Sequence, residues 1–118
     1  VLEIKIGNSV WRDIEAAGGV FLSGGYNGAI DSCCQNPLAN RRAWSGKSGA
    51  NQTSEFITSK VKLPPSAVGE NIQIRFRVGT DLGTFREGQY IDDLTVSDGF
   101  ACACENAVSS KTIFDFDG

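Results

Sequence analysis

Apolar and polar residues alternate most regularly between Asn71 and Ser97, and this stretch predicts two strands. Apolar residues fill every second position from 72 to 78, namely Ile72, Ile74, Phe76 and Val78. A period of two predicts a strand with one buried face. The stretch from residue 89 to residue 97 is rich in strand-forming residue types and predicts the second strand.

One residue of the second strand does not fit its pattern. In a regular strand, Asp92 would share a face with the apolar residues Tyr90, Leu94 and Val96. An unpaired buried carboxylate is unfavourable and tends to take up a proton. We therefore expect either a β-bulge near residues 91–93 or a compensating partner for Asp92, such as a cation.

The remaining pattern predicts more short strands joined by turns. Leu2, Ile4 and Ile6 define one face of a strand that forms a hairpin with residues 10–14, in which Trp11 packs against the core. Paired glycines predict turns between residues 15 and 32. The polar residues 36–54 predict a surface loop, and residues 55–63 predict another strand, which ends at Pro64-Pro65.

Composition supports an all-β domain. The chain has 118 residues, which suits one domain that buries roughly two thirds of its unfolded surface. Fourteen glycines and three prolines favour short strands with tight turns over helices. The chain starts at Val1 in mid-strand and contains no methionine, so we expect a fragment of a larger protein.

Charge and hydropathy argue against two classes of partner. The formal net charge is −3, so no basic field would attract nucleic acid. No apolar run approaches the roughly 20 residues of a transmembrane helix. We expect neither nucleic-acid binding nor a membrane span.

The four cysteines predict disulfides. Cys33 is adjacent to Cys34, and Cys102 is two positions before Cys104. Bridges within each pair would be strained, so we expect two disulfides that join the loop around residues 32–36 to the tail, with the pairing left open. A four-thiolate zinc site and free thiols are the alternatives. Disulfides indicate a secreted or cell-surface protein.

The chain does not have the residues of a typical enzyme. It contains no histidine, so catalysis would depend on carboxylates. Asp92 and Asp93 are adjacent on a strand and would point to opposite faces, so they cannot flank one glycosidic bond. We predict that the chain is not an enzyme.

Carboxylates gather near the end of the last predicted hairpin and favour a calcium site. Calcium takes six to eight oxygen ligands from carboxylates and from backbone carbonyls of irregular loops. The candidate ligands are Asp81, Glu87, Asp92 and Asp93, with Glu3 as a further candidate from the first strand. The alternative is that Asp81 caps a turn, Asp92 bonds to amides or an arginine, and the others are solvated.

Two sets of residues are candidates for ligand binding. Arg75 and Arg77 fall on the outer face of their strand, where exposed arginines are also ordinary surface residues. Tyr26, Trp44 and Arg42 are candidates for stacking on a glycan.

The runs RAWSGKSG, VKLPPSAVGENIQIRFRVGTD and GQYIDDLTV resemble the MAM-like jelly-roll modules of large secreted bacterial proteins. The opening VLEIKIG and the combination RFR and YIDDLTV are also similar to the jelly-roll subrepeats of reelin. This resemblance, over most of residues 1–98, implies a jelly-roll antiparallel β-sandwich, a structural calcium ion with Asp92 or Asp93 as ligand, and a role in adhesion or substrate positioning. The cysteine pairs are not part of the family pattern.

The ending TIFDFDG resembles the start of an FG-GAP repeat, whose aspartate-rich loop binds calcium in β-propellers. The resemblance implies that Asp115 and Asp117 belong to a following repeat. The expected organisation is a sandwich over residues 1–105, which lacks its first strand or two, and a tail or linker over residues 106–118.

Three functions follow as expectations. The first is a non-catalytic extracellular module for binding, adhesion or domain positioning, with neighbouring domains, a surface glycan or a protein as partner. The second is a carbohydrate-binding module of a secreted hydrolase, which requires exposed coplanar aromatic rings. The third is a structural spacer.

Overall fold

The chain folds into antiparallel sheets joined by turns. The computed structural model describes residues 1–81, 88–97 and 111–117, and it describes the last range by its backbone. The strands are β1 (Leu2–Ile6), β2 (Arg12–Asp13), β3 (Val20–Ser23), β4 (Gly28–Ala29), β5 (Arg42–Ala43), β6 (Phe56–Lys62), β7 (Ile72–Phe76), β8 (Tyr90–Ser97) and β9 (Lys111–Asp117). Two short 3-10 turns, η1 (Ala50–Gln52) and η2 (Pro65–Ala67), are the helical segments of this described part.

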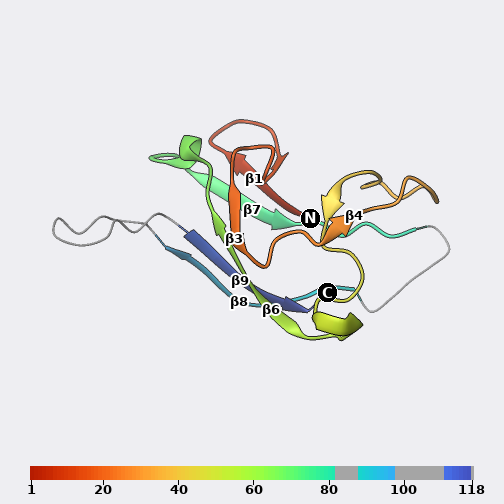
Figure 1. Cartoon of the computed structure of the whole chain (residues 1–118). Helices are drawn as coiled ribbons and strands as arrows, with labels where there is room; N and C mark the ends of the chain where they lie inside the picture. The colour runs from red at the N-terminus through yellow and green to blue at the C-terminus, as the bar shows by residue number, and fades with distance from the viewer. Residues whose placement is uncertain (82–87, 98–110, 118) are drawn as a thin grey trace.

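The strands form two main sheets and one small hairpin. The first sheet has the order β2-β1-β7, the second has the order β3-β6-β9-β8, and β4 pairs with β5. All described pairings are antiparallel. Figure 1 shows β1 and β7 in one layer and β6, β8 and β9 in another. The prediction of an all-β fold is confirmed at this level.

The main core lies between the two sheets. Leu2 and Ile4 of β1 and Val61 of β6 are buried together with Ile14, and the partly buried Phe21 of β3 packs against them. The alternation along β1 explains its share of the core, because Leu2 and Ile4 lie on one face of the strand. They pair with apolar residues of β7, as the sequence pattern predicts.

A second cluster covers the other face of β1. Val1, Leu38 and Ala43 are buried together, and Leu38 is 1% exposed. The prediction of a surface loop over residues 36–54 is therefore wrong for Leu38 and Ala43. Single apolar residues in a polar segment carry no periodicity, so only the fold of the β4–β5 hairpin over β1 shows that they are buried.

A β-bulge in β8 changes which of its side chains lie on each face of the sheet. Asp92 pairs with residue 115 and Thr95 with residue 113, so two residues, Asp93 and Leu94, oppose one residue of β9. Cross-strand partners share a face of a sheet. Asp92 therefore lies on the same face as the exposed Thr58 of β6. The expected bulge is confirmed, and it removes the need for a partner that would compensate a buried Asp92.

The last strand is inside a sheet. The expected organisation has a tail or linker over residues 106–118, but Lys111–Asp117 forms β9 between β6 and β8. The positions proposed as the start of a following repeat, Asp115 and Asp117, belong to this strand. The alternation in TIFDFD suits a strand, and its partners lie too far away in sequence to be inferred from a local pattern.

Asp93 is the residue on which the bulge depends. Its φ is +52°, a left-handed conformation that aspartate tolerates better than β-branched residues. We predict that Asp93→Val lowers the free energy of unfolding by about 1–2 kcal/mol, whereas Asp93→Gly changes it by less than about 0.5 kcal/mol. Urea unfolding of both variants checks this, and equal effects of valine and glycine would contradict the described backbone.

Candidate functional site

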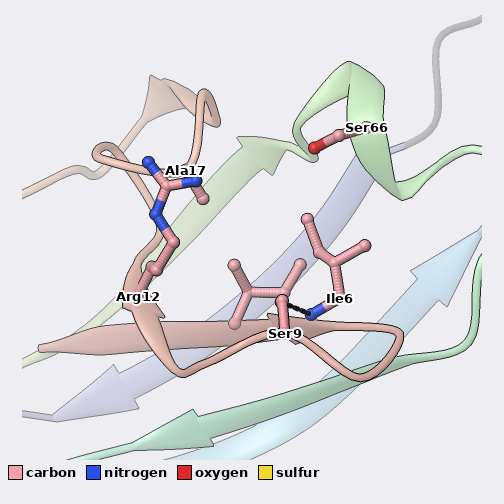
Figure 2. Close-up of a pocket in the computed structure, with 6 residues that line it drawn as sticks. Ile6, Ser9, Arg12, Ala17 and Ser66 are labelled. Atoms are coloured by element: carbon pink, nitrogen blue, oxygen red, sulfur yellow. Dashed lines mark hydrogen bonds between the residues drawn. The ribbon is translucent and has the colours of Figure 1, made fainter.

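Among the hollows on the described surface are two small ones. The first has a volume of about 220 Å³ and is lined by Ile4, Ile6, Ser9, Arg12, Ala17 and Ser66. Figure 2 shows Ser9 close to the backbone of Ile6, while the Arg12 side chain extends toward the loop that carries Ala17. Arg12 donates a hydrogen bond of 2.6 Å to the carbonyl of Ala16, which holds its side chain against this loop.

The second hollow is lined by charged side chains. It has a volume of about 240 Å³ and lies among Asp13, Glu15, Ala16, Arg41 and Arg42. Sites for small molecules usually measure roughly 300–1,000 Å³. Neither of these two hollows reaches this size.

A row of charged residues crosses the outer face of the first sheet. Glu3 lies between Asp13 of β2 and Arg75 of β7, its cross-strand partners. Arg75 Nε donates to Glu3 Oε1 at 2.6 Å, and Arg41 donates to Glu3 Oε2 at 2.8 Å and to Asp13 Oδ2 at 2.9 Å. The Glu3 side chain is 5% exposed, so two arginines neutralise one buried carboxylate.

The environment of Glu3 shifts its titration. Burial raises the pKa of Glu3, but the hydrogen bonds and charges of Arg41 and Arg75 outweigh burial and hold the pKa below its ordinary value. Because two cations already satisfy both carboxylate oxygens, Glu3 does not fit its predicted role as a calcium ligand. Its contacts make it a structural residue.

Of the two predicted ligand-binding arginines, Arg75 has a structural role. Besides its bond to Glu3, its guanidinium lies 4.3 Å from the centre of the Trp11 ring, which is a cation–π contact. The described core clusters do not include Trp11, so this contact with Arg75 takes the place of the expected packing against the core. Arg77 is exposed, and its backbone pairs with Val1 at the edge of the ladder.

The rings proposed for glycan stacking belong to an interior cluster. Tyr26 and Trp44 contact each other edge to face at 4.8 Å, and Phe21 contacts both. Trp44 Nε1 donates to the carbonyl of Gly24 at 3.0 Å, and the Tyr26 hydroxyl accepts from the amide of Leu2 and lies 2.9 Å from Asp13 Oδ2. Burial raises the pKa of Tyr26. Both rings therefore pack against other aromatic rings and bond to the backbone. They do not present a flat, exposed face on which a sugar could stack.

The third member of the glycan set, Arg42, is a surface residue. Its Nε donates to Glu15 Oε1 at 2.9 Å, and its side chain is 66% exposed. An exposed ion pair of this kind contributes little stability.

The predicted calcium ligands do not form one cluster among the described residues. Asp92 is exposed and accepts a hydrogen bond from the amide of Asp93, while Asp81 lies beside Asn36 at 3.4 Å. Glu87 falls outside the described residues. Calcium binding stays a prediction, which these contacts do not test.

The described cysteines pair differently from the prediction. Cys33 and Cys34 form a disulfide with each other, with a Cα–Cα distance of 3.7 Å, whereas we expected bridges from this loop to the tail. Cys102 and Cys104 lie outside the described residues. The two described sulfur atoms and an Asp81 carboxylate oxygen all lie within 4.8 Å of one another. The sequence did not indicate this proximity, because Asp81 lies far along the chain.

Among the residues that the structure describes, nothing covers a set of apolar side chains on β8. We call Ile91, Leu94 and Val96 the β8 surface; these residues are between 41% and 53% exposed. Tyr90 is also exposed, but the register places it with Phe56 on the opposite face. Through the register, Ile91 shares the face of Ile57, and Val96 shares the face of the buried Val61. The core cluster contains no residue of β8, so the second sheet extends beyond the first.

No protein-family model, curated protein or solved structure matches this chain. Within the described part of the chain, no helix has the length and apolar character needed to cross a bilayer.

The buried charge of Glu3 can be tested by substitution. Removing one partner of a fully buried ion pair costs roughly 3–5 kcal/mol. Because Arg41 and Arg75 are 28% and 40% exposed and can regain water, we predict a smaller loss. Glu3→Gln should lower the free energy of unfolding by about 2 kcal/mol, and the control Glu15→Gln by less than about 1 kcal/mol.

The effect of Glu3 should also depend on pH. Its folded-state pKa lies below the unfolded value of 4.5, so ionised Glu3 stabilises the fold above that pH. This stabilisation is lost as the pH falls from there through the lowered pKa. Urea unfolding from about pH 7 to about pH 3 should therefore show the difference between wild type and Glu3→Gln shrinking. A difference that stays constant would contradict the assigned ion pairs.

Proposed function

We propose that this chain is a non-catalytic, extracellular β-sandwich module of the jelly-roll type, which positions a neighbouring domain of a larger protein. The observation that supports the proposal most strongly is the uncovered β8 surface. Soluble proteins seldom leave adjacent large apolar residues in contact with water, and such patches commonly mark interfaces. The partner that we propose is a protein domain with an apolar contact surface.

The shape of the sheet explains why an apolar partner fits. Ile91 and Val96 lie on the face that packs against the first sheet elsewhere in the molecule. At β8 that face continues beyond the covering strands. A neighbouring domain placed there would extend the existing core instead of creating an isolated contact.

The bulge favours docking through a face over pairing along an edge. β8 is the outermost strand of its sheet, and free edges invite another strand to pair. The extra residue at Asp93 and Leu94 interrupts the ladder, and the two adjacent aspartates add charge at this point. Bulges and charges on edge strands oppose strand addition.

Other observations agree with binding better than with catalysis or glycan recognition. The two described hollows are smaller than usual ligand sites. The chain contains no histidine. The rings of Tyr26 and Trp44, on which the carbohydrate-binding alternative depends, lie in the interior cluster. No specific observation therefore favours the alternative function.

A pair of neighbouring residues on β8 provides the test. Val96 lies on the proposed docking face, and Thr95 points to the opposite face and is also exposed. We predict that Val96→Lys weakens association with the adjacent domain, supplied as a separate chain, by roughly tenfold or more. Thr95→Lys should leave association nearly unchanged, as measured by titration calorimetry.

Both substitutions are at exposed positions, so each should change the free energy of unfolding by less than about 0.5 kcal/mol. Hydrogen exchange offers a second measurement. In a longer chain that includes the neighbouring domain, the amides of residues 90–97 should exchange more slowly than in the module alone. Equal exchange, together with equal binding of the two lysine variants, would refute the proposed interface.

The proposal includes a structural calcium ion, which the sequence supports through Asp81, Asp92 and Asp93. Glu3 is no longer included, because Arg41 and Arg75 hold it. Asp92 and Asp93 are exposed, and carboxylate oxygens are suitable calcium ligands.

Metal removal tests this ion directly. We predict that EDTA lowers the melting temperature, that calcium restores it, and that magnesium does so less effectively because it requires a tighter octahedral site. Asp92→Asn should reduce the calcium-dependent part of the shift. An unchanged melting temperature after complete metal removal would exclude a structural calcium ion.

A further inference from the structure

We propose that Cys33, Cys34 and Asp81 form a redox-gated site for a thiophilic divalent cation such as Zn²⁺. In the disulfide form the sulfur atoms are bonded to each other and the site is closed. In the dithiol form, two thiolates and one carboxylate become available to one metal ion. This site is independent of the proposed docking function. It shares Asp81 with the proposed calcium ligands and differs from them in its two thiolates.

The positions of the three side chains support a common site. The two sulfur atoms and one Asp81 oxygen already lie within 4.8 Å of one another. Two sulfurs bound to one tetrahedral zinc at 2.3 Å would be about 3.8 Å apart, so opening the disulfide requires only a small separation. Thiolates select zinc and similar soft ions over calcium and magnesium. Three protein ligands leave the fourth zinc position for water.

The surrounding residues hold Asp81 against the cysteine loop. Asn36 donates from Nδ2 toward Asp81 Oδ1 at 3.4 Å, while its own Oδ1 accepts from the amide of the buried Leu38 at 2.9 Å. Gly79 allows the close approach of the two segments. A Cβ at that position would lie 2.6 Å from Asn36 Oδ1 and 2.9 Å from Leu38 Cγ. The carboxylate is thus positioned by a buried anchor, although it lies far from the cysteines in sequence.

The backbone conformation and the exposure of the cysteines indicate that a reductant can reach and reduce the Cys33–Cys34 disulfide. Cys34 and Gln35 have φ values of +71° and +59°, which are unfavourable for residues other than glycine, asparagine or aspartate. Strained backbone that persists at such a place is often linked to function. Both cysteines are exposed, and exposed disulfides are more often labile than buried structural ones.

The redox step uses a protein or small-molecule dithiol as reductant. Two electrons and two protons pass from that dithiol to the Cys33–Cys34 disulfide. The protein S–S bond breaks and an S–S bond forms in the reductant. When Zn²⁺ binds, both cysteine thiols release their protons to solvent, so binding should strengthen as the pH rises.

The test compares zinc binding by the reduced and oxidised protein. A Cys102→Ser/Cys104→Ser background confines the measurement to the proposed site, and wild type is measured beside it. After reduction and removal of the reductant under nitrogen, Zn²⁺ is titrated against a chromophoric chelator. Cd²⁺ is added separately to record the sulfur-to-metal charge-transfer band. We expect one Zn²⁺ per chain in the reduced protein and roughly 100-fold weaker binding after oxidation.

Variants separate the ligands from the fold. Cys33→Ser should weaken the cadmium band, because only the Cys34 thiolate remains, and Asp81→Asn should weaken zinc binding by about tenfold. Asp31→Asn, an exposed carboxylate near the same loop, should leave zinc binding unchanged. Gly79→Ala should weaken zinc binding but leave both thiols reactive toward an alkylating reagent. Circular dichroism confirms that each variant is folded.

Four results would overturn the proposal. They are equal zinc uptake by the reduced and oxidised protein, unchanged affinity of Asp81→Asn, loss of binding in the Cys102→Ser/Cys104→Ser background, and a Cys33–Cys34 pair that resists reduction by a dithiol. Calcium added to the reduced protein serves as a control, since thiolates do not favour it.

Discussion

The fold depends on how one buried carboxylate is neutralised. Glu3 lies at the centre of the first sheet and is almost completely removed from water, which is unfavourable for an isolated charge. Arg75 comes from the adjacent strand β7, and Arg41 comes from the segment before β5. Because Arg41 also bonds to Asp13 of β2, this charged group connects all three strands of the sheet with the hairpin that covers them.

The same covering hairpin brings other parts of the molecule together. Ala43 of this hairpin and Leu38 of its connecting loop are buried with Val1, and Asn36 of the same loop reaches Asp81 beyond the end of β7. The packing of this hairpin and the candidate metal site therefore depend on the same segment. The contacts that bury one face of β1 also place a carboxylate beside the Cys33–Cys34 pair. In the larger sheet, β8 is the end strand, and its apolar side chains stay exposed among the described residues.

The sequence predicted strands correctly where the local alternation was strong. It did not predict contacts between residues that lie far apart in the chain. The alternation in β1 and β7 identified their core faces, and the misplaced aspartate in β8 indicated a bulge. The candidate sites were less predictable. Tyr26 and Trp44 are aromatic residues in a glycine-rich and a polar segment, and nothing local distinguishes an exposed stacking ring from a ring that packs edge to face. Likewise, the pairing of Arg41 with Glu3 joins residues whose proximity depends on the fold.

By itself, the sequence determined the all-β class, the strands with clear alternation and the irregularity at Asp92, because these features depend on spacing along the chain and on the chemistry of single residues. Only the tertiary structure decided which charges are buried together, that β9 lies between β6 and β8, that β8 remains uncovered, and that Asp81 meets the two cysteines. The physical reason is that burial and electrostatic pairing depend on which residues are neighbours in three dimensions. Strands with the same alternating pattern can pair in many different orders, so the pattern does not identify these neighbours.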